Sequence, residues 1–225
     1  MRKIKRLNIF VDETGEFGFG YGASELYGVS FTFHEQENNI NKQIFELNNR
    51  LEKIGYTNMI HMADLIMKRG DYAKLNIEKR RKIFNAIYHF ARKIPVKYKT
   101  IIINKNYINN SKILKVQLTY EINKIIIDNN DYFKSFDKIV LYYDNGQEQL
   151  GNILDSAFIK FNNFEHRKDF NHQQKRLFQI SDMLTYIDKF DYKYKNKMTF
   201  SKSEKYFFEE KSIRKIIKTL YDKRL

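Results

Sequence analysis

The sequence predicts an α/β fold in which helices flank a mixed β-sheet and further helices close the chain. Two apolar segments suited to strands come first, and helical segments then alternate with further strands. At 225 residues the chain has the length of one large domain, and no Ser-, Pro- or Gly-rich linker marks a boundary. We therefore expect a single domain over residues 1–225, with the last ~35 residues as a basic helical extension.

The first two strands are expected to form a hairpin-like pair. The first, at about residues 4–12, has apolar residues on both faces, with Phe10 opposite its apolar neighbours, which is typical of a covered central strand. The second, "LYGVSFTF" (26–33), alternates large apolar residues with Ser30 and Thr32, which predicts a strand buried on one face only. The glycine-containing segment between them forms a long connection.

The later elements follow from periodicity and from residues that end helices. Gly55 is a C-cap signal, Pro95 bounds a helix, and Ser111 is an N-cap candidate. The expected helices span residues 38–55, 76–94, 111–130, 147 to about 162, 177–190 and 210–224, and the further strands span residues 96–104 and 137–146.

Two of the expected strands end in acidic residues. "IFVDETG" places Asp12 and Glu13 at the tip of the first strand, and "IVLYYDNG" places Asp144 at the end of a later one. If these strands are adjacent and parallel, Asp12 and Asp144 meet beyond their carboxyl ends, where such sheets bind ligands. The repulsion between the carboxylates would then need a cation, and oxygen ligands of this kind suit Mg²⁺ or Mn²⁺.

A third acidic candidate is Asp182 in "LFQISDMLTY". Gln179, Asp182 and Tyr186 fall on a side of the helix away from its apolar stripe. Three carboxylates from two strand ends and a helix could hold one or two divalent ions for phosphodiester cleavage. The simpler interpretation is that an aspartate after a strand serves a turn and that Asp182 belongs to a solvated helix face. The adjacent pair Asp12 and Glu13 favours a site, because a turn needs only one of them.

The overall composition limits which classes of partner and which cellular compartments are expected. The net charge of +14 and the pI of about 9.6 favour nucleic acid as an anionic partner, although a composition rich in Lys, Asn, Ile, Tyr and Phe is also typical of an AT-rich genome. Cysteine is absent, which excludes disulfides and thiolate chemistry. No segment reaches the ~20 apolar residues of a membrane span. We expect a soluble, cytoplasmic protein and leave a partner protein or a homo-oligomer open.

Four ordered motifs resemble a known family. "FVDETGEFG", "IHMADL" (60–65), "YYDNG" (142–146) and "LFQISDMLTY" (177–186) look like the motifs of the domain-of-unknown-function family numbered 3800, and the resemblance covers roughly residues 5–190. The family is thought to have a ribonuclease H-like fold, and its members are discussed as metal-dependent nucleases in bacterial and mobile-element defence loci, which include phage defence. The resemblance implies the same fold and activity for this chain.

The resemblance also implies roles for particular residues. Asp12 matches the signature aspartate and Glu13 its neighbour, while Asp144 matches the strand-end aspartate and Asp182 the late-helix one. Asp12, Asp144 and Asp182 would then be metal ligands, with Glu13 as a ligand or a base. The chain departs from the family pattern in having a threonine after Glu13 and a serine before Asp182, and neither change removes a ligand.

His61 and the basic segments complete the set of candidates. The apolar neighbours of His61 are typical of a core histidine, whereas the family's Ile-His segment favours a neutral imidazole that orients water or contacts phosphate. Asp64 could orient the His61 ring or cap a turn. Lys105 could reach a scissile phosphate, and "KRRK" (79–82) is more often a solvent-exposed face than a binding patch.

Two functions therefore remain open. The first is a Mg²⁺- or Mn²⁺-dependent nuclease with Asp12, Glu13, His61, Asp144 and Asp182 at its site. The second is a non-catalytic nucleic-acid-binding or regulatory module, in which the carboxylates are structural and the basic, aromatic-rich tail binds the strand by charge and stacking.

Overall fold

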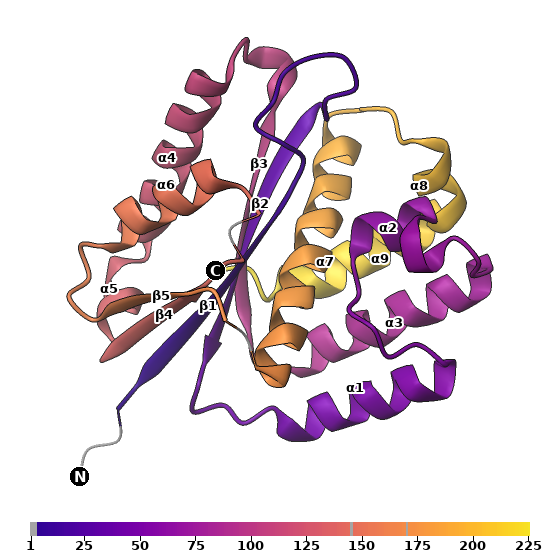
Figure 1. Cartoon of the computed structure of the whole chain (residues 1–225), viewed down its shortest axis with the longest axis horizontal. Helices are drawn as coiled ribbons and strands as arrows, with labels where there is room; N and C mark the ends of the chain where they lie inside the picture. Colours follow the sequence, from indigo (N-terminus) through magenta and orange to yellow (C-terminus); the bar gives the residue numbers. More distant parts are fainter. Residues whose placement is uncertain (1–3, 145, 170) are drawn as a thin grey trace.

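The protein folds around one five-stranded mixed sheet, seen in the computed structural model in Figure 1. The structure describes residues 4–144, 146–169 and 171–225. The strands are β1 (Arg6–Thr14), β2 (Leu26–Glu35), β3 (Lys97–Asn104), β4 (Lys138–Tyr142) and β5 (Phe164–Arg167). Their order is β3-β2-β1-β4-β5, with β2 antiparallel to both neighbours and β4 parallel to both of its own. The predicted mixed α/β class is confirmed, and β1 is the central strand.

Helices cover both faces of this sheet. They are α1 (Asn41–Ile54), α2 (Met62–Met67), α3 (Ile77–Lys93), α4 (Ser111–Asp128), α5 (Asn130–Lys134), α6 (Glu148–Phe158), α7 (His172–Lys195), α8 (Lys202–Phe207) and α9 (Glu210–Tyr221). Helices α4, α5 and α6 lie on one face, and α7 crosses the other face beneath α1, α2, α3, α8 and α9 (Figure 1). None of the helices in the described ranges is both long and apolar enough to cross a membrane.

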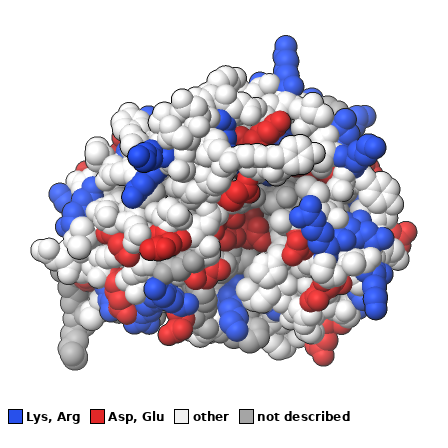
Figure 2. Space-filling view, turned by 45° about the horizontal axis from the view of Figure 1, so that its top comes forward, with Lys and Arg blue, Asp and Glu red and all other residues white. Residues whose placement is uncertain are grey.

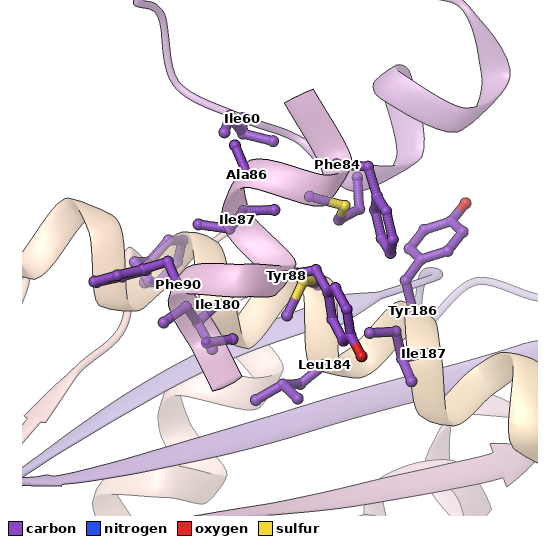
Figure 3. Packing of buried hydrophobic residues seen from close by; sticks show 14 of the residues in the cluster. Ile60, Phe84, Ala86, Ile87, Tyr88, Phe90, Ile180, Leu184, Tyr186 and Ile187 are labelled. Carbon is purple, nitrogen blue, oxygen red and sulfur yellow. The ribbon is translucent and has the colours of Figure 1, made fainter. Parts of the chain in front are cut away.

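Each face has its own hydrophobic core. Phe10 belongs to the core on the α7 side, where its ring stacks on Tyr142 with the centroids 4.8 Å apart, while Val11 belongs to the core on the α4 side. This is the two-sided burial that the sequence predicts for a central strand. Figure 3 shows the α7-side core, to which α3 contributes Ile87 and Phe90 and α7 contributes Ile180.

The prediction that β2 is buried on one face only is wrong. Ser30 and Thr32 are fully buried, because α7 packs directly over them. The Ser30 hydroxyl donates to the Ser181 carbonyl at 2.6 Å, and Ser181 Oγ lies 2.8 Å from Thr32 Oγ1. A Cβ on Gly28 would lie only 3.0 Å from Thr185 Cγ2, so the glycine lets α7 approach this strand closely. Small polar residues here mark a helix contact rather than solvent.

Most predicted elements are present with shifted ends. Gly55 caps α1 in the left-handed conformation, with φ of 72°, as predicted. The N-cap of α4 is Asn110, not Ser111, because the Asn110 side chain accepts from the Ile113 amide at 3.0 Å. Strand β4 ends at Tyr142, so that Asp144 follows the strand instead of terminating it. The short elements α2, α5, α8 and β5 are additional to the predicted ones.

Two basic segments, "KRRK" (79–82) and the last residues of the chain, make structural contacts within the fold. In "KRRK", Arg80 is buried and its Nη1 donates to Leu65 O at 2.8 Å and Ile66 O at 3.1 Å, near the C-terminal end of α2. The last residues of the chain join β3, since the Leu225 amide donates to Tyr98 O at 2.8 Å. The Arg224 guanidinium donates to Asp188 Oδ1 at 2.6 Å, which ties this end to α7.

Candidate functional site

The acidic residues predicted from the sequence lie at one edge of the sheet. Strands β1 and β4 are parallel and in register, with Phe10 opposite Tyr142, so both strands finish at the same edge. Asp12 lies near the end of β1, and Asp144 follows the end of β4. The sequence predicts that Asp12 and Asp144 meet only if their strands are adjacent and parallel, and this pairing of β1 with β4 is confirmed. Figure 2, in which the top of Figure 1 is turned forward, shows Asp and Glu side chains around a central hollow and Lys and Arg side chains farther out.

Asp12 and Glu13 do not face each other, although they are adjacent in sequence. Successive side chains of a strand point to opposite faces. Asp12 therefore shares the α7 face with Phe10, and Glu13 shares the α4 face with Val11. On that second face the charge of Glu13 helps to raise the pKa of the buried Tyr27 and Tyr143 hydroxyls above their usual value, after the larger effect of burial. The strand thus separates the two charges and gives one carboxylate to each face.

Asp182 joins Asp12 on the α7 face. Burial raises the pKa of Asp12 well above its usual value, and the charges of Asp182, Glu13 and Asp144 raise it further in that order. Burial is also the main reason that the pKa of Asp182 rises to about 7, with further contributions from Asp64 and Glu13. Each charged residue that raises these two pKa values is itself acidic. Keeping both carboxyl groups ionised therefore costs free energy.

Glu13 and Asp144 form the other half of the acidic group. Burial and then the charge of Asp144 raise the pKa of Glu13 to about 7, while hydrogen bonding from Tyr143 and Gln147 lowers it in part. Glu13 Oε2 is buried without a hydrogen-bond partner among the described residues. Both carboxylates approach the backbone of Gly146, whose amide donates to Asp144 Oδ1 at 3.0 Å. A Cβ on Gly146 would lie 2.8 Å from Glu13 Oε1 and 3.4 Å from Asp144 Oδ1.

Gly146 therefore offers a test of how tightly this part of the site is built. Gly146→Ala is expected to push Glu13 aside and to lower any cation-dependent activity about tenfold, because a contact of 2.8 Å to a carboxylate oxygen forces that group to move. Gly18→Ala is the matched control, since its Cβ would be 3.8 Å from the nearest atom, Glu16 Cγ. Equal activity of both variants in a cleavage assay would show that Glu13 and Asp144 need not converge.

The segment around His61 is fastened to the same helix as Asp182. Asp182 Oδ2 accepts from the Met62 amide at 2.7 Å and so caps the N-terminus of α2, whose N-cap residue His61 makes no side-chain cap. One turn earlier, Gln179 Nε2 lies 3.1 Å from Met59 Sδ. The predicted shared side of Gln179 and Asp182 is thus confirmed, and both residues contact the segment that precedes α2.

His61 is exposed, which removes the interpretation as a core histidine. It lies immediately before the Met62 amide that Asp182 binds, and its own amide contacts the Tyr72 hydroxyl at 3.1 Å. Asp64, predicted as a partner of the His61 ring or as a turn cap, acts on Asp182 instead, by raising its pKa. Through this effect on Asp182, Asp64 extends the acidic group, and its place in "HMADL", two residues after the contacted amide, is the signal for it.

Lys105 makes structural contacts within the protein. Its side chain is buried, and its Nζ donates to Glu16 O at 2.9 Å and to Gly18 O at 2.7 Å. These contacts fix the loop that leaves the acidic end of β1. Lys105 therefore positions the edge of the site and does not reach toward a substrate phosphate.

The residues of this edge fit a divalent cation in their chemistry. Asp12, Glu13, Asp144 and Asp182 are hard oxygen donors, and Glu13 Oε2 lacks any partner in the described part of the chain. Within residues 4–144, 146–169 and 171–225, no group of three His, Asp or Glu side chains is already arranged to hold a metal ion. Cation binding would thus require the two acidic pairs to draw together.

Comparison of the chain with protein families, with curated proteins and with solved structures gives no match.

Proposed function

We propose that this protein is a nuclease that hydrolyses phosphodiester bonds of DNA or RNA with Mg²⁺ or Mn²⁺. The observation that carries the proposal is the crowding of Asp12, Glu13, Asp144 and Asp182 at the carboxyl ends of two parallel strands, where like charges and burial raise the pKa of three of them. Crowding of this kind costs free energy in the absence of a cation and favours its binding.

The four carboxylates have distinct places in this proposal. Asp12, Asp144 and Asp182 would hold the cation, and Glu13 would serve as a further ligand or as a base. When bound, the cation activates a water molecule and stabilises the leaving oxygen. His61, exposed beside the α2 N-terminus, would act as an auxiliary acid or base on a phosphate that enters from solvent.

The fold and the charge support the same function. A five-stranded mixed sheet with helices on both faces is compatible with a ribonuclease H-like fold, which the resemblance to the family numbered 3800 implies. The net charge of +14 favours an anionic polymer as substrate. By the same resemblance, a bacterial defence or mobile-element context is the proposed biological setting.

The alternative is a non-catalytic nucleic-acid-binding module on the same fold. It is favoured by the finding that no three described His, Asp or Glu side chains are already arranged around one ion. The nuclease is favoured by the position of Asp182, whose charge is the largest electrostatic contribution to the raised pKa of Asp12. Capping the Met62 amide gives Asp182 a structural contact, but it does not explain why a second buried carboxylate, Asp12, lies beside it.

The test is an incubation of purified protein with end-labelled single- and double-stranded DNA and RNA, with Mn²⁺, with Mg²⁺ or with a chelator. Cleavage is expected with a divalent cation and not with the chelator. Binding of a substrate without cleavage under every condition would identify the protein as the binding module.

A further inference from the structure

A polar cavity opens on the α7 face, next to Phe10 on the side away from Asp12. Its volume is about 470 Å³, within the size range of small-ligand sites. It is bounded by the first half of β1, the end of β2, the start of α1, the end of β5 and the start of α7. Its lining residues are Arg6, Asn8, Phe10, His34, Gln36, Glu37, Asn39, Asn41, Arg167, Asn171, Gln174 and Leu177. Most of this lining is polar, which distinguishes the cavity from a packing defect in the core.

The electrostatics of this cavity favour an anion. Two guanidinium groups, Arg6 and Arg167, line it against one carboxylate, Glu37. The helices α1 and α7 both begin at the cavity, through Asn41 and the N-cap Asn171, and neither has an acidic residue in its first turn. Helix N-termini carry partial positive charge and bind phosphate groups. Two arginines and two helix N-termini thus contribute positive charge to the same cavity.

Arg6 and Arg167 are held in place differently. Arg6 Nε donates to Asn8 Oδ1 at 3.0 Å, and its Nη2 donates to the Tyr142 hydroxyl at 2.9 Å. Arg167 Nε donates to Glu165 Oε1 at 2.5 Å, and its side chain is 40% exposed. Arg6 is therefore built into the wall, whereas Arg167 at the rim can be replaced without opening the core.

His34 supplies an independent observation that points to a ligand. It is only 3% exposed, and its Nε2 lies 2.9 Å from the Asn38 carbonyl oxygen. A carbonyl can only accept, so Nε2 carries the hydrogen. Burial lowers the pKa of the ring, which is therefore neutral with Nδ1 as an acceptor. Nδ1 is buried without a partner among the residues that the structure describes. A buried acceptor of this kind requires a donor.

We propose that this cavity binds a phosphorylated nucleoside. The phosphate lies between Arg167, Arg6 and the two helix N-termini, and a sugar hydroxyl or base amine donates to His34 Nδ1. A nucleoside monophosphate offers sugar hydroxyls or base amines as donors to His34 Nδ1 while its phosphate stays between the arginines, whereas inorganic phosphate would have to serve both places with one small group. The amide side chains of the lining, such as Asn8 and Gln36, suit the edges of a base.

The cavity lies close to the acidic edge along two elements. Phe10 lines it, and Asp12 follows on the same face of β1, ~7 Å farther along the strand. Leu177 lines it, and Asp182 lies ~7.5 Å farther along α7. Binding in the cavity needs no cation and no cleavage. If the proposed nuclease function holds, the natural occupant is a nucleotide of the substrate strand.

The test is isothermal titration of the full chain in the presence of a chelator, so that cleavage plays no part. The probes are adenosine monophosphate, cytidine monophosphate, unphosphorylated adenosine, inorganic phosphate and a 5′-phosphorylated dinucleotide. The monophosphates are expected to bind more tightly than adenosine or phosphate. Arg167→Gln is expected to weaken this binding about tenfold to a hundredfold, because a charge-assisted contact is lost. Arg50→Gln, an exposed arginine on α1 outside the cavity, is the matched control.

His34→Phe separates the nucleoside contact from the phosphate contact. It should reduce the preference for adenosine monophosphate over inorganic phosphate, with circular dichroism used to verify the fold. Tighter binding of the dinucleotide than of the monophosphates would identify a strand end as the source of the ligand, and the reverse would identify a free nucleotide. Absence of monophosphate binding, equal binding by Arg167→Gln and Arg50→Gln, or binding of inorganic phosphate alone would overturn the proposal.

Discussion

Asp12→Asn is expected to reduce nuclease activity by about 10³-fold or more, which corresponds to ~4 kcal/mol of lost transition-state stabilisation. Asparagine keeps the shape of the side chain and removes the charge that a cation would neutralise. The fold should survive, because the pKa of Asp12 is already raised by burial and by three acidic neighbours, so that the loss of one charge relieves repulsion. The measurement is cleavage of labelled DNA and RNA with Mn²⁺ or Mg²⁺.

Asp131→Asn is the matched control for this experiment. Asp131 is an exposed aspartate on α5, away from the acidic edge, and its substitution should leave cleavage unchanged. The thermal midpoint of the Asp12 variant must be at least that of the wild type for the result to report on chemistry. Retained cleavage with unchanged metal dependence in Asp12→Asn would refute the assignment of the site.

The metal-free protein is expected to lose stability as the pH rises from 5 to 8. Glu13 and Asp182 each have a pKa of about 7 in the folded protein, above the usual values of 4.5 and 3.8. The folded state therefore binds more protons than the unfolded state between about pH 4 and 7, and its free energy of unfolding falls across that window. The expected loss is on the order of 2 to 3 kcal/mol for each of the two groups, since each pKa unit corresponds to ~1.4 kcal/mol.

Two further measurements assign this pH dependence to the acidic edge. Asp182→Asn should flatten the curve, because asparagine does not titrate and still accepts from the Met62 amide. Mn²⁺ should raise the thermal midpoint at pH 8 and much less at pH 5, where protons compete for the same oxygens. Denaturant unfolding and thermal scans give both results. Equal slopes for the wild type and Asp182→Asn would place the titrating groups elsewhere.

The strand-end acids could be predicted because their signal is local. An apolar run followed by an aspartate identifies both a strand and its end, and two such runs predict Asp12 and Asp144 at one edge if the strands are parallel. The helical position of Asp182 followed from spacing alone. The contact by which the Asp182 carboxylate caps α2 could not be predicted, because it joins residues 120 positions apart.

Polar residues in buried places account for most of what the sequence did not predict. Ser30 has the pattern of a solvent-facing residue, yet its hydroxyl is satisfied by a helix carbonyl. Lys105 and Arg80 bind backbone carbonyls inside the fold, although their charge suggests a surface. Periodicity measures polarity and does not show which distant group satisfies it. Strand β5, "FEHR", has too few apolar residues to be recognised as a strand.

The opposite directions of Asp12 and Glu13 also bear on how the chain reaches its native pairing. A slip of β1 by one residue along its neighbours would turn every side chain of the strand to the opposite face of the sheet. Asp12 would then face the α4 side and Glu13 the α7 side. It would also turn Phe10 away from its stacking partner Tyr142. The alternation of side chains along β1 therefore specifies its register, with the stacking of Phe10 on Tyr142 as the contact that a slip would lose.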